Sequence, residues 1–310
     1  MINSYMPLDR LSPYLQFQKQ QIEHSLDDLD PTWIHATIIK KYCIELKETI
    51  DQMLSNVDII SKSNSYRYDR KKDKYTSWVE VMRLALFQYE RFAQGGLALS
   101  EGLYASLIMS AATWNTRNLE KIVVLGCGPG RSVLDFSKLY PMSEVEGLDY
   151  SLFSLMLAEK IICGSEDVSI IRRDVFSDNY SEILSVPGMS RKNVTLGLID
   201  LGQDDYPQAD MIICSNVLNL LPNHRYTVNQ MYKSLNTGGI VVFADLLGWR
   251  LDREAERKEI RTKNRISSLF TEVGFTTLDQ FEGVPYIESE SKEQYVLYKE
   301  HFYIGRKEKC

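Results

Sequence analysis

A short glycine-rich stretch constrains the fold of this chain more than any other part of its sequence. The apolar run from Ile122 to Leu125 is followed by Gly126, Gly128 and Gly130, and a helical pattern begins at Ser132. A strand, a glycine turn and a helix in this order let the backbone approach a ligand closely, because a Cβ atom would collide or forbid the dihedral angles. The stretch therefore predicts a ligand-binding turn between a buried parallel strand and a helix.

The spacing of the glycines separates two classes of nucleotide-binding turn. The dinucleotide fingerprint is G-x-G-x-x-G, whereas here the third glycine comes two residues after the second and is followed by Arg131. Asp149 lies at the end of the next apolar run, where a carboxylate can accept both hydroxyls of a ribose. A purely structural turn would leave the three glycines and this acid as a coincidence. Arg131 stands in place of the last glycine of the dinucleotide fingerprint, which argues against a nicotinamide-dependent oxidoreductase.

The G-x-G-x-G turn with Asp149 resembles motif I of the class I S-adenosylmethionine (SAM)-dependent methyltransferases, and the order of elements over roughly 121–306 is similar to the core of that family. The resemblance implies an α/β fold: a three-layer, doubly wound, mostly parallel sheet with a C-terminal antiparallel strand. It implies SAM as the cofactor and S-adenosylhomocysteine (SAH) as the product. The implied function is methyl transfer to an N, O or S atom of a small molecule or peptide, as in natural-product metabolism.

Strand and helix patterns alternate from Glu120 onward, which predicts a parallel sheet with helices on both faces. The expected strands are 122–125, 145–148, 168–171, 211–214 and 240–244, closed by antiparallel strands at 275–281 and 294–306. A second segment, the apolar run 194–201, could form strand three instead. Asp200 rather than Asp174 would then be the acid at the end of that strand. The normal loop length before 168–171 favours Asp174.

Residues 1–115 carry helical patterns, which predict an all-helical region ahead of a SAM-binding core at 116–310. Ser77 to Glu80 fits a capping box, and a helix over 101–114 leads into the first strand. We expect this region to form a substrate lid or a contact in a homodimer. Its candidate substrate-binding residues are Tyr66, Tyr68 and Trp78. The alternative for the segment 61–75 is a solvated linker.

By the resemblance, the cofactor would lie across the ends of strands one, two and four. The residues that would contact it are Gly126, Cys127, Gly128, Gly130, Asp149, Tyr150, Asp174, Val175, Ser215 and Asn216. Asp149 would bind the ribose hydroxyls and Tyr150 would pack on the adenine. Asp174 would accept the adenine amino hydrogens, with the Val175 N–H donating to a ring nitrogen. A helix cap at Asp174 and a surface aromatic at Tyr150 are the plainer alternatives.

The stretch after strand four indicates the class of acceptor. Residues 215–222 lack the N/D-P-P-Y/F pattern of many enzymes that methylate nucleic-acid bases, and they resemble small-molecule methyltransferases instead. Asn219 and Trp249 are candidate substrate contacts. His224 is a candidate base because its pKa suits neutral pH, and Asp245 is a candidate for orienting a cationic or hydroxyl substrate. A solvated histidine at a helix start is the alternative for His224.

Charge and cysteine usage restrict the partners. The net charge of −6 gives no general attraction to nucleic acid or anionic membranes, and no apolar run reaches membrane-spanning length. The five scattered cysteines are typical of reduced thiols, and the four histidines form no metal motif. We therefore expect a cytoplasmic transferase without a metal, a nucleic-acid partner or a membrane partner. A SAM-binding protein without turnover is the main alternative.

Overall fold

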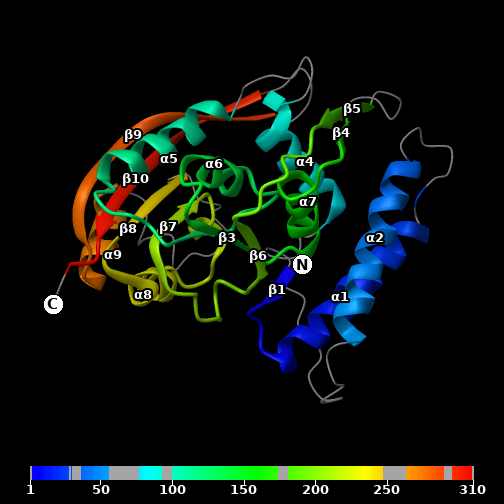
Figure 1. Cartoon of the computed structure of the whole chain (residues 1–310), viewed down its shortest axis with the longest axis horizontal. Helices are drawn as coiled ribbons and strands as arrows, with labels where there is room; N and C mark the ends of the chain where they lie inside the picture. Colours follow the sequence, from blue (N-terminus) through cyan, green and yellow to red (C-terminus); the bar gives the residue numbers. More distant parts are fainter. Residues whose placement is uncertain are drawn as a thin grey trace.

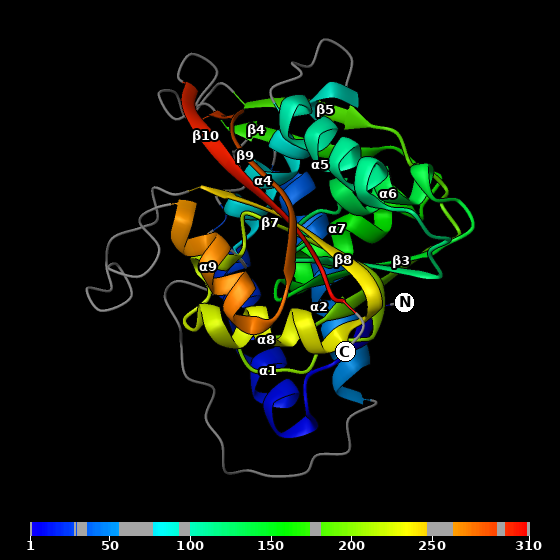
Figure 2. The same cartoon turned by 90° about the vertical axis from the view of Figure 1, so that its left-hand side faces the viewer.

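An eight-stranded sheet runs through the molecule in the order β1-β6-β3-β2-β7-β8-β10-β9 (Figures 1 and 2). The computed structural model describes residues 2–27, 29, 36–55, 77–92, 100–173, 181–246, 263–289 and 295–308. The strands of this sheet are β1 Ile2–Ser4, β2 Lys121–Leu125, β3 Glu144–Asp149, β6 Val194–Leu198, β7 Ala209–Ser215, β8 Leu235–Leu246, β9 Thr276–Ser289 and β10 Tyr295–Arg306. From β1 to β8 all neighbours pair in parallel, and β10 pairs antiparallel with both β8 and β9. The predicted α/β fold with an antiparallel edge is confirmed.

Helices cover both faces of the sheet (Figure 2). They are α1 Leu8–Asp27, α2 Ala36–Ser55, α4 Trp78–Tyr89, α5 Glu101–Trp114, α6 Arg131–Leu139, α7 Leu152–Ile162, α8 His224–Ser234 and α9 Lys263–Val273. Single 3₁₀ turns follow α4 (η1, Glu90–Phe92) and β7 (η2, Leu218–Leu220).

The side chains of β2 show why this sheet needs a layer on each face. Ile122 and Val124 pack into the apolar cluster that contains residues of α5, α6 and α7. Val123 and Leu125 pack into a second cluster with residues of α8 and α9. Successive residues of a strand point to opposite faces, so an apolar run of this kind is stable only when both faces are buried.

The prediction for strand three was wrong. Residues Val168–Arg173 form β4, which pairs antiparallel with β5 (Ser181–Val186) in a separate two-stranded sheet. The neighbour of β3 in the main sheet is β6, with Val145 opposite Val194. Position 200, not 174, therefore follows the third strand, and Asp174 lies outside the described residues.

The polarity of the two segments explains this choice of strand better than loop length does. A parallel strand inside the sheet must be apolar on both faces, and Leu196, Leu198 and Ile199 are all buried. The segment that forms β4 has Ser169 in its middle and two arginines at its end, which suits a strand with a polar side. Gly197 also leaves room for the residue that follows β1, because a Cβ atom at position 197 would lie 2.7 Å from the Tyr5 ring.

The N-terminal region is helical, as predicted, and it also contributes β1 to the edge of the sheet. Helices α1 and α2 lie side by side next to the sheet (Figure 1). Leu15 of α1 and Ile39 of α2 belong to the same buried cluster as Ile122 of β2. The Tyr42 hydroxyl donates a 2.8 Å hydrogen bond to the Ser169 carbonyl. The region therefore shares its apolar core with the rest of the molecule.

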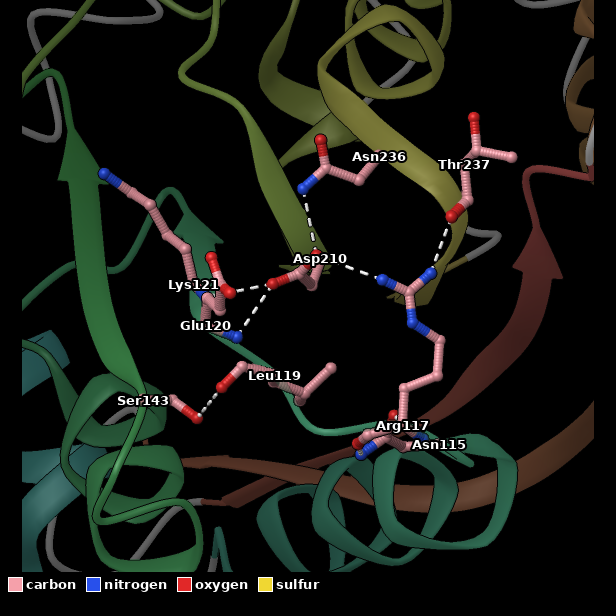
Figure 3. Close-up of polar contacts among 9 residues, drawn as sticks. All are labelled: Asn115, Arg117, Leu119, Glu120, Lys121, Ser143, Asp210, Asn236 and Thr237. Atoms are coloured by element: carbon pink, nitrogen blue, oxygen red, sulfur yellow. Dashed lines mark hydrogen bonds and ion pairs between the residues drawn. The ribbon is translucent and has the colours of Figure 1, made fainter.

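A carboxylate at the amino ends of the strands holds three of them in register (Figure 3). Oδ2 of Asp210 accepts from the N–H groups of Glu120 and Lys121 at 2.8 and 3.1 Å. Its Oδ1 accepts from Asn236 at 2.9 Å, and Arg117 lies 3.3 Å away. Although burial acts in the opposite direction, these donors hold the pKa of Asp210 below its ordinary value. The starts of β2, β7 and β8 are thereby tied together, at the end of the sheet opposite the candidate site.

Candidate functional site

A cavity of about 310 Å³ opens at the carboxyl ends of β2, β3, β7 and β8. Its walls come from three parts of the chain: the ends of these strands, the helices α4 and α5, and the β9–β10 hairpin. The residues named from the sequence that line it are Gly126, Cys127, Gly128, Asp149, Tyr150, Ser215, Asn216 and Asn219. The carboxyl ends of strands in an open α/β sheet are where ligands of such folds bind.

The glycine turn requires glycine for two physical reasons. Gly126 and Gly128 have φ angles of 60° and 54°, in the left-handed region that disfavours other residues. A Cβ atom at position 126 would also lie 2.1 Å from Cγ2 of Val217. At position 128 it would lie 2.9 Å from Cδ2 of Leu84 in α4. The turn is thus pressed between the segment after β7 and a helix of the N-terminal region.

Asp149 is held at the cavity wall by backbone donors. The N–H of Gly128 donates to its Oδ2 at 2.7 Å, and the N–H of Ser151 donates to its Oδ1 at 2.8 Å. Burial raises the pKa of Asp149, and these N–H groups oppose that rise. A carboxylate has about four acceptor sites, so the fixed side chain retains capacity for the two hydroxyls of a ribose.

Tyr150 is positioned by α1. The hydroxyl of Tyr14 donates a 2.6 Å hydrogen bond to the carbonyl of Tyr150. The two rings meet edge to face, with their centroids 4.9 Å apart. Tyr14 itself is buried. The first helix therefore fixes a residue of the cavity wall, which sequence patterns did not indicate.

A buried arginine joins the N-terminal helices to the glycine turn. Arg131, the first residue of α6, lies 2.6 Å from Asp135 and 2.8 Å from Glu101 of α5. Its Cζ atom lies 4.7 Å from the ring centroids of both Phe92 and Tyr104. A buried charge is tolerated only with such partners. Sequence reasoning used Arg131 only to argue against a nicotinamide cofactor and missed this anchor.

Helix α4 contacts the same turn through its last residues. The side-chain Oε1 of Gln88 accepts from the Arg131 N–H at 3.0 Å, and the Gln88 carbonyl accepts from the guanidinium at 2.9 Å. The buried hydroxyl of Tyr89 donates to the Pro129 carbonyl at 2.9 Å. The predicted cap of α4 is confirmed, since the Ser77 side chain accepts from the Glu80 N–H. Helix α4 is thus fixed directly over the glycine turn.

A buried carboxyl supports the polar end of the cavity. Oδ1 of Asp245 accepts from the Asn219 side chain at 2.7 Å and from the Leu246 N–H at 2.7 Å. Asp245 is fully buried, and burial raises its pKa to about 7 against the effect of these donors. Asp245 does not itself line the cavity, whereas Asn219 and Leu246 do. In this structure it positions Asn219 rather than facing a ligand.

A second buried carboxyl, Glu300 of β10, was missed by sequence reasoning. Its Oε1 accepts from the Asn216 side chain at 2.7 Å, and Asn216 has a left-handed φ of 56°. Burial, followed by the charge of Asp245, raises the pKa of Glu300 to about 8. The sequence does contain a signal for Glu300. It is an acid two residues from both Tyr298 and Phe302, so it shares a strand face with two aromatic residues.

The remaining predicted residues are not among the described residues that line the cavity. Gly130 caps α6 with a φ of 95° and packs toward α7. His224 is the first residue of α8, is buried, and is not among the described residues that line the cavity. Trp78 is the first residue of α4. The other named residues are Tyr66, Tyr68, Asp174, Val175 and Trp249, and they lie outside the described residues.

The described part of the chain shows neither a metal site nor a membrane segment. Within it, no group of three His, Cys, Asp or Glu side chains is placed to hold a metal ion. None of the described helices combines the length and the apolar character that crossing a membrane requires.

Two solved structures with TM-scores of 0.50 or more show the fold. The [4+2]-cyclase SpnF aligns with a TM-score of 0.51 at 12% identity, over 77% of this chain and 96% of that chain. A complex between the Haloferax volcanii Trm112 methyltransferase activator and a putative methyltransferase aligns with a TM-score of 0.50 at 10% identity, over 79% and 100%. The N-methyltransferase NodS from Bradyrhizobium japonicum WM9, in complex with SAH, aligns with a TM-score of 0.43 at 14% identity, over 68% and 89%.

Sequence comparison adds the family. No curated protein sequence matches the chain. A family model described as a methyltransferase domain matches residues 89–280, which is more than half of the chain. The matched range contains the glycine turn, Asp149 and the strands from β2 to β8. The chain therefore belongs to the methyltransferase-domain family.

Proposed function

We propose that this protein is a SAM-dependent methyltransferase that transfers a methyl group to an N, O or S atom of a small molecule or peptide. The observation that carries the proposal is the placement of Asp149 beside the glycine turn, in a cavity that continues to a separate wall of α4, α5 and the β9–β10 hairpin. One end suits a nucleoside and the other suits a second reactant. A SAM-binding protein without turnover would not need the second end.

The residues present fit SAM. The glycine turn would hold the methionine and ribose portions, and Asp149 would accept the ribose hydroxyls. Tyr150 would pack on the adenine, and Ser215 and Asn216 would contact the amino-acid end. Asp200, which follows β6 and lines the cavity, would take the adenine contact in place of Asp174.

The chemistry asks for alignment more than for reactive side chains. SAM supplies an activated methyl group, so the protein must orient the acceptor and exclude water. Leu84 and Phe87 of α4 and Leu103 of α5 line the cavity, which supports a role for the N-terminal region as a lid. A contact in a homodimer remains compatible with that role.

The test is calorimetric titration of the full chain with SAM, SAH and NAD. We expect SAM and SAH to bind and NAD not to bind measurably. Release of SAH in the presence of a panel of acceptors would then report turnover. Binding of NAD with no binding of SAM or SAH would overturn the proposal.

A further inference from the structure

Four aromatic side chains line one end of the cavity. Phe87 comes from α4, Tyr104 from α5, Tyr286 from β9 and Tyr298 from β10. The Phe87 ring centroid lies 4.8 Å from that of Tyr286 and 6.5 Å from that of Tyr104. The centroids of Tyr286 and Tyr298 lie 5.9 Å apart. We call these four residues the aromatic wall.

Strand register places a carboxyl beside the aromatic wall. Tyr298 is directly opposite Tyr286, and Glu300 is opposite Val284 two residues further along β10. Because side chains alternate along a strand, Tyr298 and Glu300 lie on the same face. Burial raises the pKa of Tyr104, the Arg131 cation opposes that rise, and the carboxylates of Asp135, Glu101 and Glu300 add to it. The register therefore places the carboxyl two residues from Tyr298 on the same face of β10, where it accepts from Asn216.

The Glu300 carboxyl has unused acceptor capacity. The side chain is fully buried, and Asn216 uses its Oε1. No donor among the described residues reaches its Oε2, and none reaches Oδ1 of Asn216. A buried acceptor without a donor is unfavourable. Asn216 lines the cavity and Glu300 lies behind it, so a ligand that brings hydrogen-bond donors is favoured beside Asn216.

The charges around the cavity have one predominant sign. The carboxylates that line it are Glu80, Glu90, Asp149 and Asp200. Among the described lining residues the only cation is Arg83, whose Nε lies 3.1 Å from Oε2 of Glu80. The buried carboxyls Asp245 and Glu300 lie behind this lining. A cationic ligand is favoured here over an anion of the same shape.

We propose that the aromatic wall and Asn216, with Glu300 behind them, form the acceptor subsite, and that it takes an amine carried on an apolar or aromatic body. The ring faces attract a cation, and Asn216 supplies an acceptor for its N–H groups. Burial raises the pKa of Glu300 to about 8, and a cation beside Asn216 favours release of that proton, so the carboxylate behind Asn216 then supplies the opposite charge. The inference rests on the proposed function and narrows its acceptor to amines.

The test uses the full chain saturated with SAH. The cofactor part of the cavity is then occupied, and the test ligands can bind only at the acceptor subsite. Calorimetry compares three ligands of matched skeleton: 3-phenylpropylamine, 3-phenylpropan-1-ol and 3-phenylpropanoate. We expect the amine to bind about tenfold or more tightly than the other two, from the strength of cation–π and charge-assisted contacts. Equal binding of the alcohol, preference for the anion, or no binding of any of the three overturns the proposal.

Two pairs of variants locate the binding. Tyr286→Leu and Glu300→Gln should each weaken amine binding by roughly tenfold, and Gln retains an acceptor for Asn216. The matched controls are Tyr232→Leu, which alters a tyrosine on α8 that packs on Phe275, and Glu272→Gln on the surface of α9. Amine affinity unchanged in both test variants would reject this location. Failure of the unaltered protein to bind SAH would instead count against the proposed function.

Discussion

The backbone N–H of Gly128 donates a 2.7 Å hydrogen bond to Oδ2 of Asp149, so the glycine turn and the acid that follows the next strand form one unit. If SAM binds there, Asp149→Ala should weaken its binding by about 2–4 kcal/mol, since two bonds to a charged group are lost and water replaces part of them. That corresponds to roughly 30-fold to 1,000-fold in the calorimetric Kd. Asp279→Ala, on the distant β9 strand, is the control, and unchanged affinity in a folded Asp149 variant would contradict the assignment.

The packing of α4 on the glycine turn predicts a stability difference between two glycine variants. Gly128 has a left-handed φ, and Gly128→Ala would place a Cβ atom 2.9 Å from Leu84. Gly283→Ala has a φ of 94° but nothing within 4 Å of its Cβ atom. The second change should cost about 1–2 kcal/mol of unfolding free energy, and the first should cost more because Leu84 must move. Urea denaturation measures both, and equal losses would show that α4 is not pressed on the turn.

Replacing the buried arginine should destabilise the protein strongly. Arg131→Met leaves the carboxylates of Asp135 and Glu101 without their shared cation, which should cost about 3–5 kcal/mol of unfolding free energy. Arg225→Met removes an exposed ion pair with Glu272 and should cost less than about 1 kcal/mol. A loss in Arg131→Met no larger than in the control would reject the anchoring role.

The two buried carboxyls predict a pH dependence of stability. Burial raises the pKa of Asp245 to about 7 and that of Glu300 to about 8, so the folded state binds more protons than the unfolded state above pH 4 to 5. Stability should therefore fall as pH rises from about 5 to 8, by at most about 1.4 kcal/mol per pH unit for each group. Urea denaturation of the wild type and of Glu300→Gln across this range measures the slope. The variant should have the shallower slope, and identical slopes would contradict the prediction.

The lid role predicts local protection of α4. Hydrogen exchange of its backbone amides, followed by mass spectrometry, should slow when SAH is added, because a ligand beneath the helix opposes its opening. Helix α9, which packs on the far side of the sheet, serves as the internal control. Protection of α9 but not of α4 would argue that the N-terminal region does not close the site.

Local patterns were sufficient for much of the fold. The glycine turn, Asp149, the capping serine of α4 and the helix Glu101–Trp114 each depend on residues a few positions apart. Apolar periodicity reports which faces are buried, so the parallel sheet and its antiparallel edge followed from the sequence. The closing antiparallel strands followed for the same reason.

Only the tertiary structure decided which distant segments meet. Loop length favoured 168–171 as the third strand, yet β6 fills that place and pairs in parallel with β3. Phe87 meets Tyr286, and Asn216 meets Glu300, across long stretches of chain. Pairing and packing between remote segments depend on the shapes and charges that surround each candidate. A periodic pattern specifies that a residue is buried, whereas the assembled core specifies its neighbours.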